Sequence, residues 1–320
     1  MSAVGVDIGG TKLLAIRVDD RGTAETEPLY MAAPGTAEEL VSAVLAAAGQ
    51  LSGSGRPEAV GVGVPGLVDR SDTLLFAPNL AGAAGARIGS ALRVGASAAR
   101  VWVGNDATAA GWAEFRVGAG QGSSDMLMVT LGTGIGGGVV SGGQLIEGAH
   151  RFAGEFGHMV VDPNGPLCPC GKRGCWERYA SGAGLGVLAR EMAVAGGAAD
   201  LTARAGGDPE HVKGEHVTAA AAAGDAAALE IMRRFGWWVA LGLANLANLF
   251  DPEVIVVGGG LVDAGAVLMD PVQEAFEGLV EAGGIRPMPI VVPAVLGPRA
   301  GAIGAGLLAA NAPGSAGVGH

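Results

Sequence analysis

The chain has 320 residues, of which 49% are hydrophobic and 16% charged, and its net charge is −11. This acidic balance argues against a nucleic-acid surface, which relies on clustered Lys and Arg. Backbone amides can still bind a small anionic ligand. No apolar run is long enough to span a bilayer, and residues 1–6 lead into a strand without a targeting segment. We therefore expect a soluble cytoplasmic protein of one large or two domains, without a membrane or nucleic-acid partner.

Two stretches share an order of strand, glycine turn and strand. Residues 7–12 (DIGGTK) follow one apolar run and precede another, and residues 132–138 (GTGIGGG) do the same about 120 positions later. Glycines let backbone amides approach an anion closely. Because a strand follows each turn, a Walker loop is excluded for the first and a dinucleotide fingerprint for the second. The repeat suits two similar domains that hold a triphosphate from both sides, although residues 7–12 alone could equally be an ordinary hairpin.

The next elements are a helix over 36–51 and a buried strand over 59–64 that stops at Pro65-Gly66. A hairpin turn is expected at 69–72 and an exposed loop at 76–80. Asn79 in that loop is a candidate hydrogen-bonding group, although such an Asn is more often a plain turn residue.

A short strand over 100–103 is followed by Asn105-Asp106 and an Ala-rich helix. Position alone favours Asp106 as the N-cap of that helix, a common role that needs no function. The alternative is a carboxylate at the carboxyl edge of a sheet, where ligands bind in open α/β folds. Asn105 would then supply an amide beside it.

All three cysteines lie in one loop together with a histidine. The four residues are His158, Cys168, Cys170 and Cys175. Three thiolates and an imidazole form the ligand set of a closed structural zinc site. Glu155 and Glu177 flank this loop, which could hold both carboxylates at fixed positions around a polar ligand.

The remaining pattern predicts a helix from 180–181, a polar loop region over 195–214 and the longest helix over 225–250. A strand over 254–257 runs into Gly258-Gly259-Gly260, a third glycine loop suited to a nucleotide. A closing helix is expected over 301–310, and the Pro/Gly/Ser tail over 311–320 is expected to be disordered.

Together these motifs resemble the ROK family of bacterial sugar kinases, and within it the glucokinases. The resemblance rests on the motifs 7–12, 64–66, 78–80, 105–106, 131–138, 155–158, the cysteine loop through Glu177, and 257–260. It implies an actin-like ATPase (ribonuclease H-like) fold with two α/β domains around a catalytic cleft. The smaller domain would span 1–109, joined by the closing helix, and the larger 110–300, with the zinc loop over 155–177.

The resemblance also implies a reaction, the ATP-dependent phosphorylation of glucose to glucose 6-phosphate. Asp106 would be the general base on the sugar 6-hydroxyl. The implied sugar contacts are Gly66, Asn79, Asn105, Asp106, Glu155, His158 and Glu177. The implied nucleotide contacts are Asp7, Gly9, Gly10, Thr11, Lys12, Gly132, Thr133, Gly134, Gly258 and Gly259. Mg²⁺ would arrive with ATP, Zn²⁺ would be structural, and the protein would form a homodimer or homotetramer.

Other functions stay open within this resemblance. N-acetylglucosamine, N-acetylmannosamine, fructose or allose could replace glucose, and polyphosphate could replace ATP as donor. A sugar-sensing repressor of the family would carry a helix-turn-helix segment before the first strand, and we expect none here because that strand is predicted to start at Ala3. An actin-like or chaperone-type ATPase would have no need of the zinc loop or of Asn105-Asp106.

Overall fold

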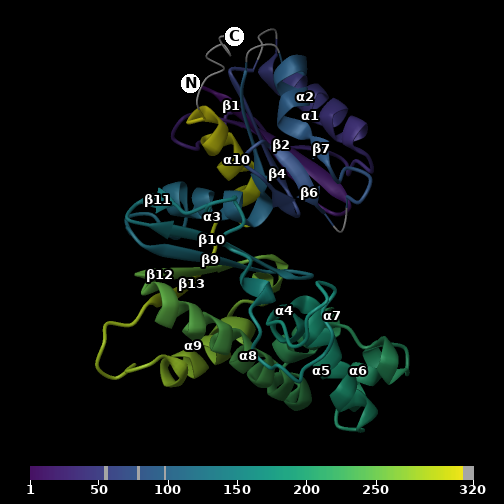
Figure 1. The fold of residues 1–320 in the computed structure, drawn as a ribbon. Helices are drawn as coiled ribbons and strands as arrows, with labels where there is room; N and C mark the ends of the chain where they lie inside the picture. Colours follow the sequence, from purple (N-terminus) through teal and green to yellow (C-terminus); the bar gives the residue numbers. More distant parts are fainter. Residues whose placement is uncertain (54–56, 78–79, 97–98, 313–320) are drawn as a thin grey trace. The chain divides into compact units, whose positions relative to one another are not determined.

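The computed structural model describes residues 1–53, 57–77, 80–96 and 99–312 (Figure 1). Asn79 and most of the tail expected to be disordered therefore lie outside the described residues. The chain divides by its internal contacts into two compact units. The first unit comprises Met1–Met128, Gly138–Gly154 and Val295–His320, and the second comprises Val129–Gly137 and Glu155–Ala294.

The first unit is built on a five-stranded sheet with the order β3-β2-β1-β4-β8. Its strands are β1 (Ala3–Ile8), β2 (Lys12–Val18), β3 (Leu29–Ala32), β4 (Ala59–Val64) and β8 (Arg100–Asn105). Strands β1 and β2 are antiparallel, and Gly9 N donates to Lys12 O at 2.9 Å, so the hairpin expected at 7–12 is confirmed. Strands β1, β4 and β8 run parallel. Their carboxyl ends bring Asp7 and Asp106 to one edge of the sheet.

Four helices and a small sheet complete this unit. The helices are α1 (Ala37–Ser52), α2 (Ile88–Gly95), α3 (Asp106–Val117) and α10 (Ala300–Ala310), and the sheet contains β5 (Leu67–Val68), β6 (Thr73–Phe76) and β7 (Ala86–Arg87). Thr36 caps α1 with Glu39 in a capping box. The expectation of an exposed loop over 76–80 is wrong in part, because Ala77 and Leu80 are buried in the hydrophobic core.

Helix α10 lies against β1, β4 and α3 (Figure 1), and glycines bring its backbone into direct contact with theirs. A methyl group at Gly5 would overlap the carbonyl oxygen of Ala302, and one at Gly61 would overlap that of Ala305. Gly304 of α10 makes the same kind of contact with Ala109 of α3. Such contacts tolerate no side chain at these glycines, so the Gly/Ala composition of α10 is a packing requirement.

A second sheet has the order β11-β10-β9-β12-β13. Its strands are β9 (Met126–Leu131), β10 (Ile135–Ser141), β11 (Gln144–Leu145), β12 (Val254–Gly258) and β13 (Ile290–Pro293). The expected order of strand, glycine turn and strand around 132–138 is thus confirmed, with no helix after the turn.

The second unit contains α4 (Glu177–Ala180), α5 (Gly182–Val194), α6 (Ala199–Arg204), α7 (Gly214–Ala222), α8 (Ala226–Phe250) and α9 (Ala266–Leu279). Asp225 caps α8, which is the long helix expected there. The expectation of a polar loop over 195–214 is wrong in part, because α6 and the 3-10 helix Pro209–His211 form within it. Leu201 of α6 is fully buried and anchors this helix in the apolar core. No helix among the described residues has the length and apolarity needed to cross a membrane.

The packing of α10 predicts opposite effects for two Gly→Ala substitutions. Gly61→Ala should destabilise the protein by about 2–3 kcal/mol, because the new methyl group overlaps the backbone of α10. Gly49→Ala is the matched control, since nothing lies within 4 Å of its added methyl group in α1. It should stabilise by roughly 0.5–1 kcal/mol through helix propensity. Urea unfolding measures both, and equal midpoints for the two variants would contradict the packing described.

Candidate active site

Asn105, and not Asp106, caps helix α3. Its Oδ1 accepts from Thr108 N at 3.0 Å, and its Nδ2 donates to Gly66 O at 3.3 Å. The N-cap interpretation of Asp106, which position alone favoured, is therefore wrong. Asp106 is the first residue of the helix, and its Oδ1 accepts from Ala107 N at 2.9 Å. Its carboxylate stays at the carboxyl edge of the parallel strands, as the alternative interpretation expected.

A second carboxylate, Asp7, shares this edge with Asp106. Both border Gly63 of β4: a methyl group there would lie 3.6 Å from Asp7 Oδ1 and 3.7 Å from Asp106 Cβ. Burial raises the pKa of Asp7 to about 7, with a further contribution from the charge of Asp106. Burial also raises the pKa of Asp106, against the lowering effect of its backbone hydrogen bonds. Two carboxylates in one poorly solvated place favour proton binding, which is typical of a functional site.

The cysteine loop of the second unit brings together the four ligands expected for zinc. The ligand atoms of His158, Cys168, Cys170 and Cys175 all lie within 4.8 Å of one another. The Cys170 and Cys175 Sγ atoms are 3.5 Å apart, and Cys168 Sγ is 3.8 Å from His158 Nδ1. A tetrahedron with Zn–S bonds of about 2.3 Å has edges of about 3.8 Å. The donor set therefore fits a four-coordinate zinc ion.

A buried tryptophan fixes the zinc loop to helix α8. Trp176 follows Cys175, is fully buried, and donates from Nε1 to Trp238 O at 2.7 Å. A methyl group at Gly242 of α8 would overlap the Trp176 ring. Tyr179 stacks on Trp238 with ring centroids 4.2 Å apart and donates to Asp162 Oδ2 at 2.9 Å. The loop is thereby held by the core of the unit as well as by its metal ligands.

Three expected sugar contacts form a row beside this cluster. Glu155 Oε2 lies 3.9 Å from His158 Nε2, and Glu177 Oε1 lies 3.6 Å from His158 Nδ1. The imidazole thus turns Nδ1 toward Cys168 and Nε2 toward Glu155. One ring nitrogen can bind zinc while the other faces a polar ligand, the division of roles that the ROK resemblance implies for His158. The side chains of Glu155 and His158 are 41% and 36% exposed, so the row is accessible.

Glu177 joins this row to the second glycine turn. Its Oε1 lies 3.0 Å from Cys168 Sγ, and a methyl group at Gly134 would lie 2.9 Å from its Oε2. Gly182 N donates to Gly132 O at 2.8 Å and holds the same turn at the start of α5. Gly259, with φ +84°, packs on the backbone of Leu131 at the end of β9. Gly259 therefore lies beside the strand end that leads into the turn 132–134.

A cavity of about 540 Å³ opens beside these glycine loops. It is lined by Gly182, Lys213, Gly214, Glu215, Thr218, Ala219, Ala222, Gly260, Leu261, Asp263 and Ala264. It combines an apolar wall from α7 with the polar groups of Lys213, Glu215 and Asp263, a mixture typical of small-ligand sites. Of these residues, the sequence singled out only Gly260. Only their position after Gly258-Gly259-Gly260 could have drawn attention to 261–264.

The first-unit candidates Thr11 and Lys12 are exposed at the tip of the β1–β2 hairpin. Lys12 Nζ lies 5.2 Å from the centre of the Tyr30 ring on β3, so a cation–π contact holds the ammonium group there.

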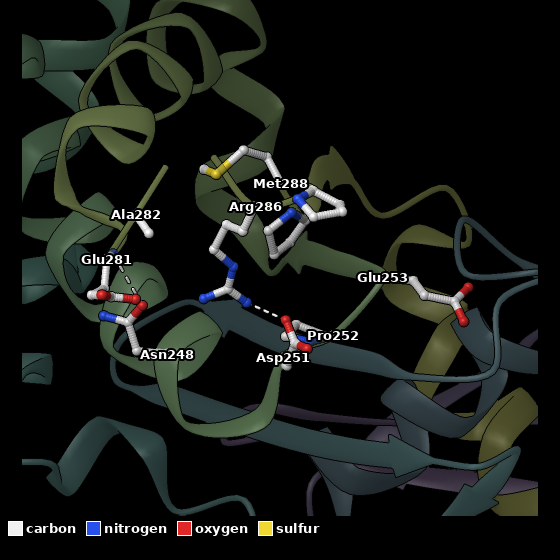
Figure 2. Close-up of a pocket in the computed structure, with 10 residues that line it drawn as sticks. Asn248, Asp251, Pro252, Glu253, Glu281, Ala282, Arg286 and Met288 are labelled. Atoms are coloured by element: carbon white, nitrogen blue, oxygen red, sulfur yellow. Dashed lines mark hydrogen bonds and ion pairs between the residues drawn. The ribbon is translucent and has the colours of Figure 1, made fainter. Parts of the chain in front are cut away.

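A further cavity of about 570 Å³ contains none of the expected site residues (Figure 2). It lies between the C-terminal end of α8 and the segment 281–289. Arg286 forms an ion pair with Asp251, and Asn248 Oδ1 accepts from Glu281 N at 3.2 Å.

Residues 3–312 match the sequence model of the ROK family. The chain belongs to the ROK family. It is 39% identical over 316 residues to a glucokinase of Streptomyces coelicolor, with 96% of each chain covered. A crystal structure of a ROK family glucokinase from Streptomyces griseus, in complex with glucose and AMPPNP, is 42% identical, with a TM-score of 0.84 and coverage of 97% of this chain and 99% of that one. An N-acetylmannosamine kinase of Citrobacter koseri is 35% identical over 82% of this chain and 84% of the relative. The ROK resemblance and the actin-like ATPase fold are confirmed.

Zinc removal should destabilise the second unit, because the metal joins four ligands spread over eighteen residues. Cys170→Ser is the suitable variant, since Cys170 is exposed and its replacement leaves no core cavity. We expect about one zinc per wild-type chain, less in the variant, and a melting temperature lower by several degrees, roughly 5 °C or more. Metal analysis and calorimetry on chelated and variant protein test this. An unchanged melting profile after verified metal loss would refute a structural role for zinc.

The carboxylate pair predicts a pH dependence of stability. The pKa of Asp7 is about 7 in the folded protein against an ordinary 3.8, so its stabilising contribution is complete below about pH 4 and lost by about pH 7. Asp7→Asn removes this loss, because the amide does not ionise. Between pH 5 and 8 the variant should gain roughly 2 kcal/mol on the wild type. Unfolding curves at several pH values measure the difference, and parallel profiles would refute it.

Proposed function

We propose that this chain is a glucokinase, which transfers the γ-phosphoryl group of ATP to the 6-hydroxyl of glucose. The carrying observation is the row Glu155–His158–Glu177 on a metal-binding loop, in a chain that matches two Streptomyces glucokinases over nearly its full length. Three adjacent acceptors of this kind suit the vicinal hydroxyls of a hexose.

Asp106 is the general base in this proposal. Phosphoryl transfer depends on positioning and charge stabilisation, and the protein has only to orient the hydroxyl and accept its proton. The raised pKa of Asp106 makes the ionised carboxylate a stronger proton acceptor. Its backbone hydrogen bond from Ala107 fixes the orientation of that carboxylate. Asn105 would act through its contact with Gly66, which ties the loop after β4 to the start of α3.

ATP is the proposed donor, with its phosphates on the glycine turns 9–12, 132–134 and 258–259 and its adenosine in the 540 Å³ cavity. Glu215 and Asp263 of the cavity offer acceptors for ribose hydroxyls. Mg²⁺ would bind with the nucleotide, mostly through water, because it dehydrates reluctantly. Zinc would be structural, since four protein ligands leave no open position.

The choice of hexose is the finer part of the proposal. Glucose is favoured because two relatives that match nearly the whole chain, at 39% and 42% identity, are glucokinases. An N-acetylated hexose is the second candidate, supported by the 35% identical N-acetylmannosamine kinase. Coupled ADP release with ATP and Mg²⁺ over glucose, N-acetylglucosamine, N-acetylmannosamine, fructose and mannose decides between them. If an N-acetyl sugar has the highest kcat/KM, that sugar replaces glucose as the proposed substrate. If no sugar is turned over, the proposal that the protein is a sugar kinase is refuted.

Asp106→Asn tests the base. The amide keeps the size of the side chain but cannot accept the proton, so kcat should fall by about 10²–10⁴-fold. Glucose binding, measured by calorimetry, should stay within about threefold of the wild type because the geometry is preserved. Turnover near the wild-type rate would remove Asp106 from this role, whereas loss of binding together with turnover would assign it to the sugar alone.

A further inference from the structure

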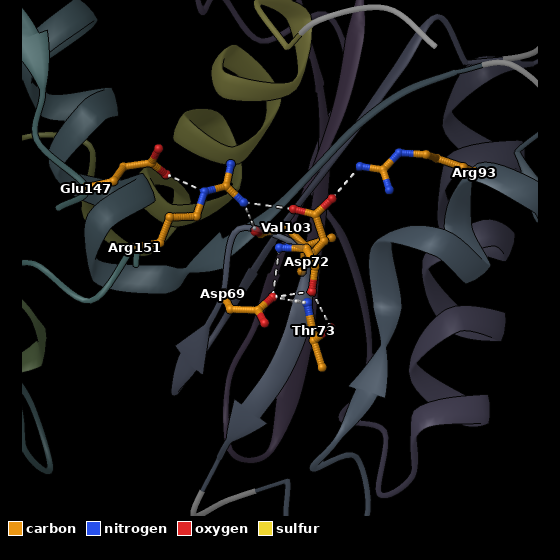
Figure 3. A network of polar contacts seen from close by, with 8 residues as sticks. Asp69, Asp72, Thr73, Arg93, Val103, Glu147 and Arg151 are labelled. Atoms are coloured by element: carbon orange, nitrogen blue, oxygen red, sulfur yellow. Dashed lines mark hydrogen bonds and ion pairs between the residues drawn. The ribbon is translucent and has the colours of Figure 1, made fainter. Parts of the chain in front are cut away.

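An ion-pair network centred on Asp72 lies in the first unit, outside the expected site residues (Figure 3). Asp72 Oδ1 accepts from Arg151 Nη1 at 2.8 Å, and its Oδ2 pairs with Arg93 of α2. Arg151 Nε lies 3.2 Å from Glu147 Oε1. The side chains of Asp72 and Arg151 are 7% and 17% exposed, whereas that of Arg93 is 42% exposed. The Asp72–Arg151 pair is thus the buried part of the network.

The backbones of Asp72 and Arg151 are both left-handed, with φ +57° and +68°. Among the described residues other than glycine, only Asp251 and Ala282 share this conformation. It is unfavourable for residues with a Cβ and persists where the surroundings over-determine it, often at functional sites. Here two such residues, 79 positions apart, bind each other.

Arg151 contacts two segments that lie close in sequence to expected sugar contacts. Its own segment lies close in sequence to a third. Its Nη1 lies 3.4 Å from Val103 O in β8, the end strand of the sheet, two residues before Asn105. Through Asp72 it holds the turn between β5 and β6, and β5 begins directly after Gly66. Along its own chain, Glu155 follows four residues later.

Arg70 holds the same segment at a second point. Its Nε donates to Ala149 O at 2.7 Å and its Nη2 to Gly148 O at 2.8 Å. The segment 147–151 is therefore attached to the turn 69–72 at two points, through Arg70 and through Asp72. A displacement of Arg151 would therefore shift the segments that carry Gly66, Asn105 and Asp106.

We propose that Arg151, held by Asp72, is a positioning residue of the sugar site. Its guanidinium sets the mutual placement of the segments that carry Gly66 and Asn105-Asp106. This rests on the proposed function, because those residues are its expected sugar contacts. A purely structural ion pair would affect stability alone. A positioning residue affects sugar binding selectively, since none of the expected nucleotide contacts lies on the segments that Arg151 joins.

Arg151→Lys and Arg93→Lys form a matched pair of variants. Both keep the positive charge and alter a contact to the same carboxylate, but only Arg151 also contacts Val103 O and Glu147. In Arg151→Lys, the KM for glucose should rise about tenfold while the KM for ATP stays within about twofold, because a lysine ammonium cannot bridge three groups as a planar guanidinium does. Arg93→Lys should keep the KM for glucose within about twofold. Steady-state kinetics and melting temperatures of both variants are measured together.

The inference is overturned if the two variants show the same KM for glucose, or if the KM values for glucose and ATP rise equally in Arg151→Lys. If Arg151→Lys does not fold, Asp72→Asn replaces it, because Asn tolerates the left-handed conformation and weakens the same ion pair. It should shift the KM values in the same direction. Wild-type turnover tests the proposed function separately. If another hexose is preferred, the same comparison uses that hexose. Failure of the folded wild type to bind any hexose overturns both proposals.

Discussion

The direct contact of helix α10 with strands β1 and β4 is the constraint on which the first unit depends. With glycine at positions 5 and 61, the helix backbone rests on the sheet itself. This close approach brings Gly301 against Asp7, where a methyl group would lie 2.7 Å from the carboxyl carbon. It also packs α10 on α3, the helix that begins at Asp106. The desolvation that raises the pKa of both carboxylates follows from this packing.

In the second unit, one histidine links a structural and a functional requirement. The ring of His158 faces the thiol cluster with Nδ1 and Glu155 with Nε2. The cysteine loop beside it is held to the core by Trp176, which donates to Trp238 O. Groups fixed in this way lose little conformational freedom when a ligand binds, which favours affinity and specificity for a rigid polyol.

Features set by neighbouring residues could be predicted from the sequence, and features set by distant ones could not. The glycine hairpins, the helix over 225–250 and the cysteine cluster depend on local spacing, and all are confirmed. The cap of α3 is an exception: it is Asn105 and not Asp106, because β8 runs through Asn105 and the helix follows it with no loop residue between them. The Asp72–Arg151 pair joins positions 79 residues apart and has no local signature. The role of Asp106 came from the family resemblance and stays a prediction.

The glycine contacts also define where this chain can be engineered for heat resistance. Replacing glycine by alanine stiffens the unfolded chain, but only where the native backbone and space permit it. At most of the glycines that touch α10 or adopt a left-handed backbone, an alanine would overlap neighbouring atoms or strain the backbone. Gly278 of α9 and Gly284 have open space around an added methyl group and lack a left-handed backbone. Among the described glycines, few residues are therefore available for such thermostabilising design, and one of them, Gly260, lines the 540 Å³ cavity.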